Sequence, residues 1–204
     1  MKYREILIEQ LKTMPYFTKE AILQFVTQYG IKKATIDSYI SRSLACKDIF
    51  PLKRGLYVTS DFYNKNKGDI SYTFYLANIL RTPSYVSSWA ALQYYNLTTE
   101  IIHTVTSVTP KLTRSFTTKA GIFAYQSMKK ELFSDFSLIK AKFDFFIASP
   151  SKALFDLLYL KTNQFRGMEF KEIDTLIDSL RIDIDEMGEG ERVKFYTLVK
   201  KYTV

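Results

Sequence analysis

The residue types best able to contact another molecule gather between positions 32 and 54, where cations and hydroxyls lie close together. One side of the helix predicted from residue 33 to residue 44 carries small hydroxyls, an aromatic ring and a base: Thr35, Ser38, Tyr39 and Arg42. Such side chains donate hydrogen bonds to base edges in a DNA groove. We expect phosphate or minor-groove contacts from the neighbouring cations Lys32, Lys33, Lys53 and Arg54. The alternative, a solvated helix face, stays open.

The elements around these residues form an ordered series. Apolar periodicity predicts a helix over residues 2–14, a second helix from the capping Thr18 to Gly30, and a third over 33–44. Two β-prone runs, 49–52 and 56–59, follow and are joined by Lys53-Arg54-Gly55, whose glycine suits a tight hairpin. Three helices and a basic-tipped hairpin predict a winged helix-turn-helix. One helix of this unit would enter the major groove while the hairpin reaches the flank.

The charge distribution supports a polyanionic partner. The chain of 204 residues carries a net charge of +8, and residues 1–82 hold 13 basic and 7 acidic residues. Residues 83–204 are nearly balanced, with 16 basic and 14 acidic residues, and the segment 169–191 holds nine acids against Lys171 and Arg181. Cations that neutralise phosphates release counterions, which supplies most non-specific affinity for nucleic acid.

The remainder of the chain predicts a second domain. Residues 61–69 are polar and predict a linker or exposed loop, so we expect domains at 1–68 and 69–204. A helix is predicted over 70–80 and another over 89–95, where Ser87 or Ser88 caps the start and Asn96 ends it. β-branched runs at 101–108, 116–118, 121–125 and 143–148 predict an antiparallel sheet, and helices are predicted over 151–161, 170–180 and 189–202. The expected fold class is α+β: an N-terminal winged helix-turn-helix domain and a mixed α/β domain with C-terminal helices.

Catalytic and metal chemistry have little support in the sequence. Serine catalysis needs an aligned base, and His103 is the single histidine; with Cys46 it cannot complete a zinc site of four protein ligands. Asp183 and Asp185 resemble a metal-binding carboxylate pair, but no Gly-Ser turn precedes them, so a solvated acidic loop is the preferred interpretation. We therefore expect no enzyme activity, catalytic residue, metal or cofactor. Without an apolar run of about 18 residues, we expect no membrane partner and a cytoplasmic protein.

Four short stretches in this order resemble the AbiEi family of antitoxins, which are transcriptional regulators of abortive-infection toxin-antitoxin operons. The stretches are PLKRGLYV at 51–58, PSYVSSWAAL at 83–92 followed by Leu97, GIFAY at 121–125 and ASPSKALFDLL at 148–158. The resemblance implies a repressor that binds inverted repeats in its own promoter, possible self-association on DNA, and a C-terminal antitoxin domain. That domain would counter an AbiEii-like nucleotidyltransferase toxin without a stable complex.

Two residues depart from the family pattern. Asn96 stands where the family usually has glycine, which is mild because asparagine tolerates the left-handed conformation. Ser151 stands where glutamate is usual, so a carboxylate is missing from a helix start. Lys152 and Asp156, one turn apart in that helix, are expected to form an ordinary ion pair.

Three alternatives remain open at this point. The chain could be a generic regulator without an antitoxin role, or a protein-interaction module whose acidic segment is the docking face. An enzyme that transfers nucleotides or cleaves nucleic acid would be suggested by the carboxylates near Asp183.

Overall fold

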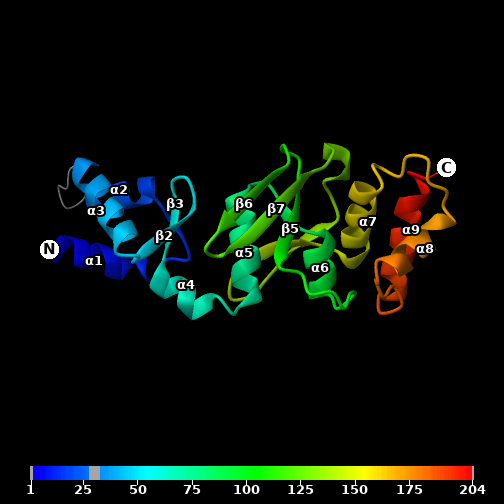
Figure 1. Ribbon diagram of the computed structural model, residues 1–204, viewed down its shortest axis with the longest axis horizontal. Helices are drawn as coiled ribbons and strands as arrows, with labels where there is room; N and C mark the ends of the chain where they lie inside the picture. Colours follow the sequence, from blue (N-terminus) through cyan, green and yellow to red (C-terminus); the bar gives the residue numbers. More distant parts are fainter. Residues whose placement is uncertain (1, 28–32, 204) are drawn as a thin grey trace. The chain divides into compact units, whose positions relative to one another are not determined.

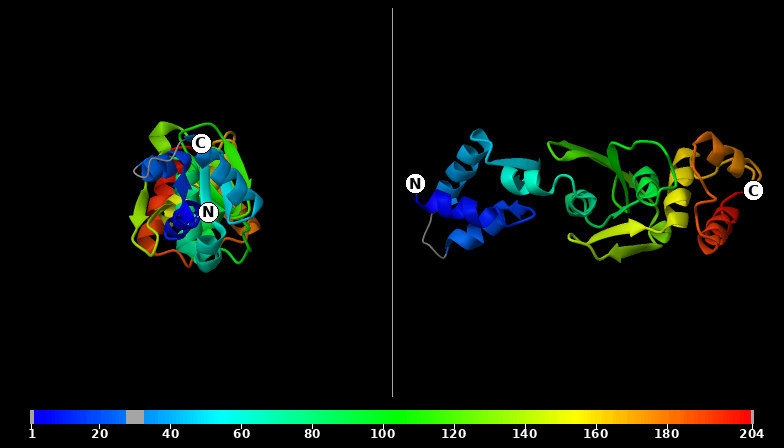
Figure 2. Two further views of the ribbon diagram at one scale, coloured as in Figure 1. Left: turned by 90° about the vertical axis from the view of Figure 1, so that its left-hand side faces the viewer. Right: turned by 90° about the horizontal axis from the view of Figure 1, so that it is seen from below.

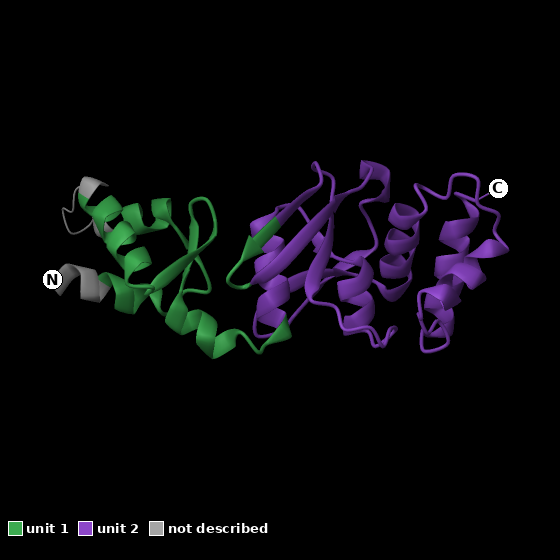
Figure 3. Ribbon diagram, viewed as in Figure 1, with its two compact units in different colours: residues 1–70, 116–120 green, residues 71–115, 121–204 purple. Residues whose placement is uncertain are grey.

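The structure is a computed structural model that describes residues 2–27 and 33–203; for residues 2–6, 25–27 and 33–34 it describes the backbone only. It divides into two compact units (Figure 3). Unit 1 comprises Met1–Ile70 and Phe116–Ala120, and unit 2 comprises Ser71–Ser115 and Gly121–Val204. The architecture is mixed α+β, as predicted.

Unit 1 combines helices with a small antiparallel sheet (Figure 1). The helices are α1 (Lys2–Leu11), α2 (Lys19–Thr27), α3 (Lys33–Ala45) and α4 (Ser60–Asn66). The strands β1 (Phe17–Thr18), β2 (Ile49–Lys53) and β3 (Leu56–Thr59) pair in the order β1-β3-β2. Thr18 caps α2 as predicted, because its hydroxyl accepts a hydrogen bond of 3.1 Å from the Ala21 amide. The predicted end of this helix at Gly30 lies outside the described residues.

The core of unit 1 explains why α3 presents one particular face outward. Its buried apolar cluster is Leu7, Leu11, Phe17, Ile22, Ile36, Ile40 and Ile49. Ile36 and Ile40 occupy it from α3, which confirms their predicted inward orientation, whereas Leu44 is only partly buried and Ser43 is buried in its place. The buried side of α3 is therefore rotated slightly about the helix axis from the predicted side, towards Ser43 and away from Leu44.

The segment predicted as a linker contains the helix α4, so that prediction was wrong. The Thr59 hydroxyl accepts a hydrogen bond of 3.2 Å from the Phe62 amide and caps the helix. Asp61 and Lys65 form an i,i+4 ion pair at 3.0 Å, which supports a short helix in a polar sequence. The polar composition had suggested a loop, but a capping hydrogen bond and one ion pair stabilise a helix in this segment.

Unit 2 is built around a six-stranded sheet of order β6-β7-β5-β4-β9-β8, although β6 from Phe116 onward is counted in unit 1. Its strands are β4 (Tyr85–Val86), β5 (Thr104–Thr109), β6 (Arg114–Thr118), β7 (Gly121–Ser127), β8 (Phe136–Ile139) and β9 (Phe145–Ala148). Its helices are α5 (Ile70–Leu80), α6 (Ser88–Tyr94), the short 3₁₀ turn η1 (Lys130–Leu132), α7 (Pro150–Lys161), α8 (Glu172–Ser179) and α9 (Glu189–Lys200). Within this unit, α7 lies between the sheet and the two last helices (Figures 1 and 2).

The predicted antiparallel sheet is in fact mixed. β4 pairs with β5 and β8 with β9 in antiparallel fashion, but β5 with β7 and β4 with β9 run parallel. Between β5 and β7 the chain reverses twice through β6, so the two strands point the same way. Alternating β-branched residues specify that a segment is extended, but not which neighbour it meets.

A buried polar cluster joins α7 to the β4–α6 turn. Lys152 and Asp156 do form the predicted i,i+4 ion pair, with Nζ to Oδ1 at 2.5 Å, but their side chains are only 2% and 0% exposed. Tyr85 and Ser87 donate hydroxyl hydrogen bonds of 3.0 and 2.7 Å to the other oxygen, Asp156 Oδ2. Burial raises the pKa of Asp156, while Lys152 and the two hydroxyls oppose that rise. This cluster, called the Lys152 cluster below, leaves no atom of the carboxylate without a partner.

The predicted capping roles at 87–88 were therefore wrong for the side chains. Ser87 occupies the N-cap position of α6, but its hydroxyl makes no capping bond and is directed to Asp156. Ser88 adopts a positive φ of 57°, where the chain turns from β4 into α6. At the other end of α6, Asn96 has φ 58° and the Leu97 amide bonds the Leu92 carbonyl at 2.9 Å, which confirms the predicted left-handed terminator.

The helix start at Ser151 has a carboxylate after all, supplied by α9. Glu191 Oε2 accepts hydrogen bonds from the Ser151 amide at 3.1 Å and from its hydroxyl at 2.6 Å. The other oxygen of Glu191 pairs with Lys194 at 2.7 Å. Partial burial opposes ionisation, but hydrogen bonds from Lys194 and Ser151 hold the pKa of Glu191 below its usual value.

We expect Glu191→Gln to lower the free energy of unfolding by about 0.5–1 kcal/mol at pH 7, since a charged cap of a helix start is lost. Because the folded-state pKa is lowered, the wild-type contribution exists above the unfolded pKa of about 4.3 and is lost as the pH falls through the folded value. Urea unfolding at pH 7 and pH 3 should show the difference shrinking at pH 3. Glu186→Gln, at an exposed loop acid, is the control; an equal loss there would contradict the proposed contact.

Candidate nucleic-acid interface

The outward face of α3 is mostly polar over residues 35–45, whose side chains the structure describes. Ile36 and Ile40 hold the opposite side in the core, which leaves a continuous exposed stripe on the surface. The stripe consists of Ser38, Ser41, Arg42 and Ala45, with Asp37 beside it. Positions separated by three, four and seven residues lie on one side of a helix.

The structure divides the predicted groove contacts into two classes. Ser38 and Arg42 are exposed, whereas Thr35 and Tyr39 are half-buried. The ring of Tyr39 packs against the apolar cluster of unit 1, so part of it serves the core. Lys32 lies outside the described residues, and of Lys33 only the backbone, at the start of α3, is described.

Ser41 belongs to this face but was missed in the sequence analysis. Its position three residues after Ser38 and next to Arg42 was sufficient to place it there by helical periodicity. The sequence-based list already contained the small hydroxyls Thr35 and Ser38, so the same periodicity argument could have added Ser41.

The single acidic residue of α3 is neutralised within unit 1. Asp37 Oδ1 forms an ion pair with Lys19 Nζ of α2. The guanidinium of Arg42 has no ion pair or hydrogen bond in the part of the chain that the structure describes. Over residues 35–45, the outer face of α3 therefore presents one uncompensated cation and small hydroxyls, a combination that favours an anionic partner.

The hairpin of unit 1 ends in a two-residue turn formed by Arg54 and Gly55. Lys53 pairs with Leu56 in the antiparallel register, so Lys53 is the last residue of β2 rather than part of the turn as predicted. Gly55 adopts φ +78°, the conformation that a tight hairpin requires and that glycine adopts without strain. Arg54 is exposed and Lys53 half-buried. Of the two predicted hairpin cations, Arg54 is the better placed to reach a partner.

The position of β2 in the sheet explains an otherwise unfavourable proline. Pro51 lies in the middle of β2, but β2 is an edge strand in the order β1-β3-β2. An edge strand tolerates proline because one side makes no ladder hydrogen bonds. A register irregularity between Pro51 and Lys53 accompanies it. This edge strand leads directly to the Arg54–Gly55 turn.

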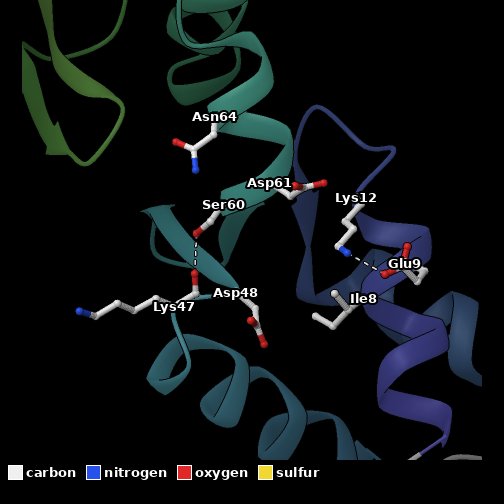
Figure 4. A pocket seen from close by; sticks show the side chains of 8 residues that line it. All are labelled: Ile8, Glu9, Lys12, Lys47, Asp48, Ser60, Asp61 and Asn64. Atoms are coloured by element: carbon white, nitrogen blue, oxygen red, sulfur yellow. Dashed lines mark hydrogen bonds and ion pairs between the residues drawn. The ribbon is translucent and has the colours of Figure 1, made fainter.

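A hollow elsewhere in unit 1 does not suit a phosphate. About 440 Å³ in volume, it lies among α1, the α3–β2 turn and α4, and its charged lining is Glu9, Lys12, Lys47, Asp48 and Asp61 (Figure 4). Lys12 bonds Glu9 at 2.7 Å, and this bond, together with the charges of Asp61 and Asp48, raises the pKa of Lys12. Lys47 extends away from these carboxylates in Figure 4. Three carboxylates would repel a nucleic-acid backbone.

Comparisons with known proteins add no family to this geometry: no protein-family model matches the chain, and no curated protein matches it. Among the described residues, no helix combines the length and apolarity needed to cross a bilayer.

Proposed function

We propose that unit 1 is a winged helix-turn-helix that binds duplex DNA, with α3 in the major groove and the β2–β3 hairpin as the wing. The observation that carries the proposal is the outer face of α3, where Arg42 stands uncompensated among small hydroxyls and the nearby Asp37 is paired with Lys19. The exposed Arg54 at the hairpin tip supports it. A groove about 12 Å wide accommodates one helix, and the hairpin arginine would reach flanking phosphate or the minor groove.

We further propose that the whole chain is a repressor and antitoxin of an AbiE-type operon in the cytoplasm. The support is the resemblance of the four sequence stretches, three of which lie in unit 2. Asn96 adopts the left-handed conformation of the glycine it would replace, and Glu191 supplies a carboxylate where Ser151 lacks one. In this proposal unit 1 binds inverted repeats of its own promoter and self-associates there, while unit 2 counters a nucleotidyltransferase-like toxin without a stable complex.

The binding proposal predicts that Arg42→Ala and Arg54→Ala each weaken binding to promoter DNA by about 1–3 kcal/mol if the arginine makes a bidentate contact. Because each removes a cation from the interface, the slope of log affinity against log salt should fall by about 1 where a phosphate contact is lost. Mobility shift at several fixed salt concentrations measures both. Lys65→Ala, at an exposed lysine on α4 that pairs with Asp61, is the matched control.

Unchanged affinity of both arginine variants would contradict the proposal. A chain that binds a protein instead would show no log-linear loss of DNA affinity with salt. For the antitoxin role, we expect a nucleotidyltransferase-like gene in the reading frame immediately downstream. Cells that express this gene alone should stop growing, and coexpression of the present chain should restore their growth.

A further inference from the structure

We infer that Arg42 is the residue that determines sequence specificity, by reading a guanine in the major groove, with Ser38 and Ser41 beside it. The inference rests on the proposed function, and it assigns base recognition to the second half of α3 instead of to all of its polar residues. The operator would then contain at least one guanine whose recognition depends on this single side chain.

The first step is the selection of residues by burial. In the first half of the helix, Thr35 is half-buried and Asp37 is held by Lys19. Tyr39 is partly engaged with the core of unit 1. Among the α3 side chains that the structure describes, residues 35–45, the stripe exposed to an incoming groove therefore runs through Ser38, Ser41 and Arg42.

The second step is the size of the neighbours. Ser38 and Ala45 lie about one turn before and after Arg42, Ser41 precedes it, and all three are exposed and small. Tyr39, also about one turn before Arg42, is half-buried against the core. Small residues allow the helix backbone to lie deep in a groove, so the one long side chain among them reaches the base edges.

The third step is the chemistry of the guanidinium. An arginine donates two parallel hydrogen bonds to O6 and N7 of guanine, which is the commonest specific contact in the major groove. Because the guanidinium of Arg42 has no ion pair or hydrogen bond in the described part of the chain, no internal contact of this group must be broken first. Serine hydroxyls bond several bases and discriminate less.

Arg54 provides the contrast within the same unit. It lies at the tip of a two-residue turn, next to Gly55 and outside the helix. At the flank of the site it would meet phosphate or the minor groove, whose pattern distinguishes bases poorly. Its loss should weaken binding to all sequences by a similar factor.

The test begins with selection of duplexes from a random library by the full chain at fixed salt. Each guanine of the selected site is then replaced by 7-deazaguanine, which lacks the N7 acceptor of the major groove, or by inosine, which lacks only the minor-groove amino group. For at least one guanine we expect 7-deazaguanine to weaken wild-type binding about 5-fold or more, and the full exchange of guanine for adenine about 5- to 150-fold. Inosine at the same place should have little effect.

The variants then assign the effect to Arg42. Arg42→Ala should bind the guanine and 7-deazaguanine duplexes equally, and Arg42→Lys should retain overall affinity better than discrimination, because lysine lacks the planar fork. Arg54→Ala should keep the full discrimination. Circular dichroism of each variant checks that unit 1 remains folded.

The outcomes separate the inference from the function on which it rests. No salt-dependent binding of the wild-type chain to any selected duplex would overturn the proposed function. Selected binding that 7-deazaguanine never weakens, or that Arg42→Ala weakens equally for every sequence, would leave DNA binding in place and overturn the assignment of Arg42.

Discussion

Replacing Lys152 by methionine is expected to lower the free energy of unfolding by about 3–5 kcal/mol, the largest effect predicted for unit 2. The lysine and Asp156 are buried together, so the substitution leaves a carboxylate without a cation at a site with no access to water. Tyr85 and Ser87 still donate to Asp156, but neutral hydroxyls do not compensate a buried charge. Urea unfolding followed by circular dichroism measures the change.

The stability loss of Lys152→Met should depend on pH. Burial raises the pKa of Asp156, and removal of the lysine removes the cation that opposes this rise. A carboxyl whose folded-state pKa lies above its unfolded value of about 3.9 is most favourable for folding below that value, and stability falls as the pH rises towards the folded value. The deficit relative to wild type should therefore be larger at pH 8 than at pH 4.5.

Two controls make this prediction specific. The double variant Lys152→Met/Asp156→Asn should regain most of the stability, because the amide carries no charge and still accepts from the hydroxyls. Lys161→Met, at an exposed lysine in the last turn of the same helix, should change the free energy of unfolding by no more than about 0.5 kcal/mol. Equal losses at Lys152 and Lys161 would show that the buried pair has no special role.

Replacing Ile36 by alanine is expected to destabilise unit 1 by about 2–5 kcal/mol and, with it, to abolish the proposed DNA binding at 37 °C. Ile36 is 0% exposed and fixes α3 in the apolar cluster that includes Phe17, Ile22 and Ile49. Truncation removes buried methyl groups and leaves a cavity, and the exposed stripe of α3 loses its support. Hydrogen exchange of the α3 amides measures the local loss.

The single tryptophan allows the effect to be located. Trp89 lies in α6 of unit 2, which has its own core. The midpoint of unfolding in urea, followed by Trp89 fluorescence, should therefore be the same in Ile36→Ala as in the wild type. Gln24→Ala, at an exposed position on α2, should change stability by no more than about 0.5 kcal/mol. A shift of the Trp89 transition as large as that of unit 1 would mean that the two units unfold together.

The candidate interface could be predicted in part because helical periodicity depends on neighbours in the chain. The order of Ile36, Ile40, Ser38 and Arg42 was enough to say which side of the third helix faces outward. The same periodicity could not show that Tyr39 would be drawn half into the core, since that depends on the space left by the other helices. It also could not show that Asp37 would be neutralised by Lys19 from another helix.

The Lys152 cluster shows where sequence reasoning stopped. Spacing predicted an i,i+4 ion pair, and the pair is present, but spacing contains no information on burial. Ser87 was predicted to cap a helix because it precedes one, yet a carboxylate 69 positions away offers its hydroxyl a stronger partner. Glu191 likewise reaches Ser151 across 40 residues and replaces a carboxylate absent from the local sequence.

Residue order by itself determined most of the helices and the 49–59 hairpin, the caps at Thr18 and Asn96, and the concentration of positive charge in the first 82 residues, because these follow from nearby residues or from composition. Only the tertiary structure decided the mixed strand directions, the burial of Lys152 with Asp156 and the partial burial of Thr35 and Tyr39 in α3. These features depend on contacts between residues far apart in the chain: burial of apolar surface brings the distant segments together, and the polar groups that become buried must then be paired.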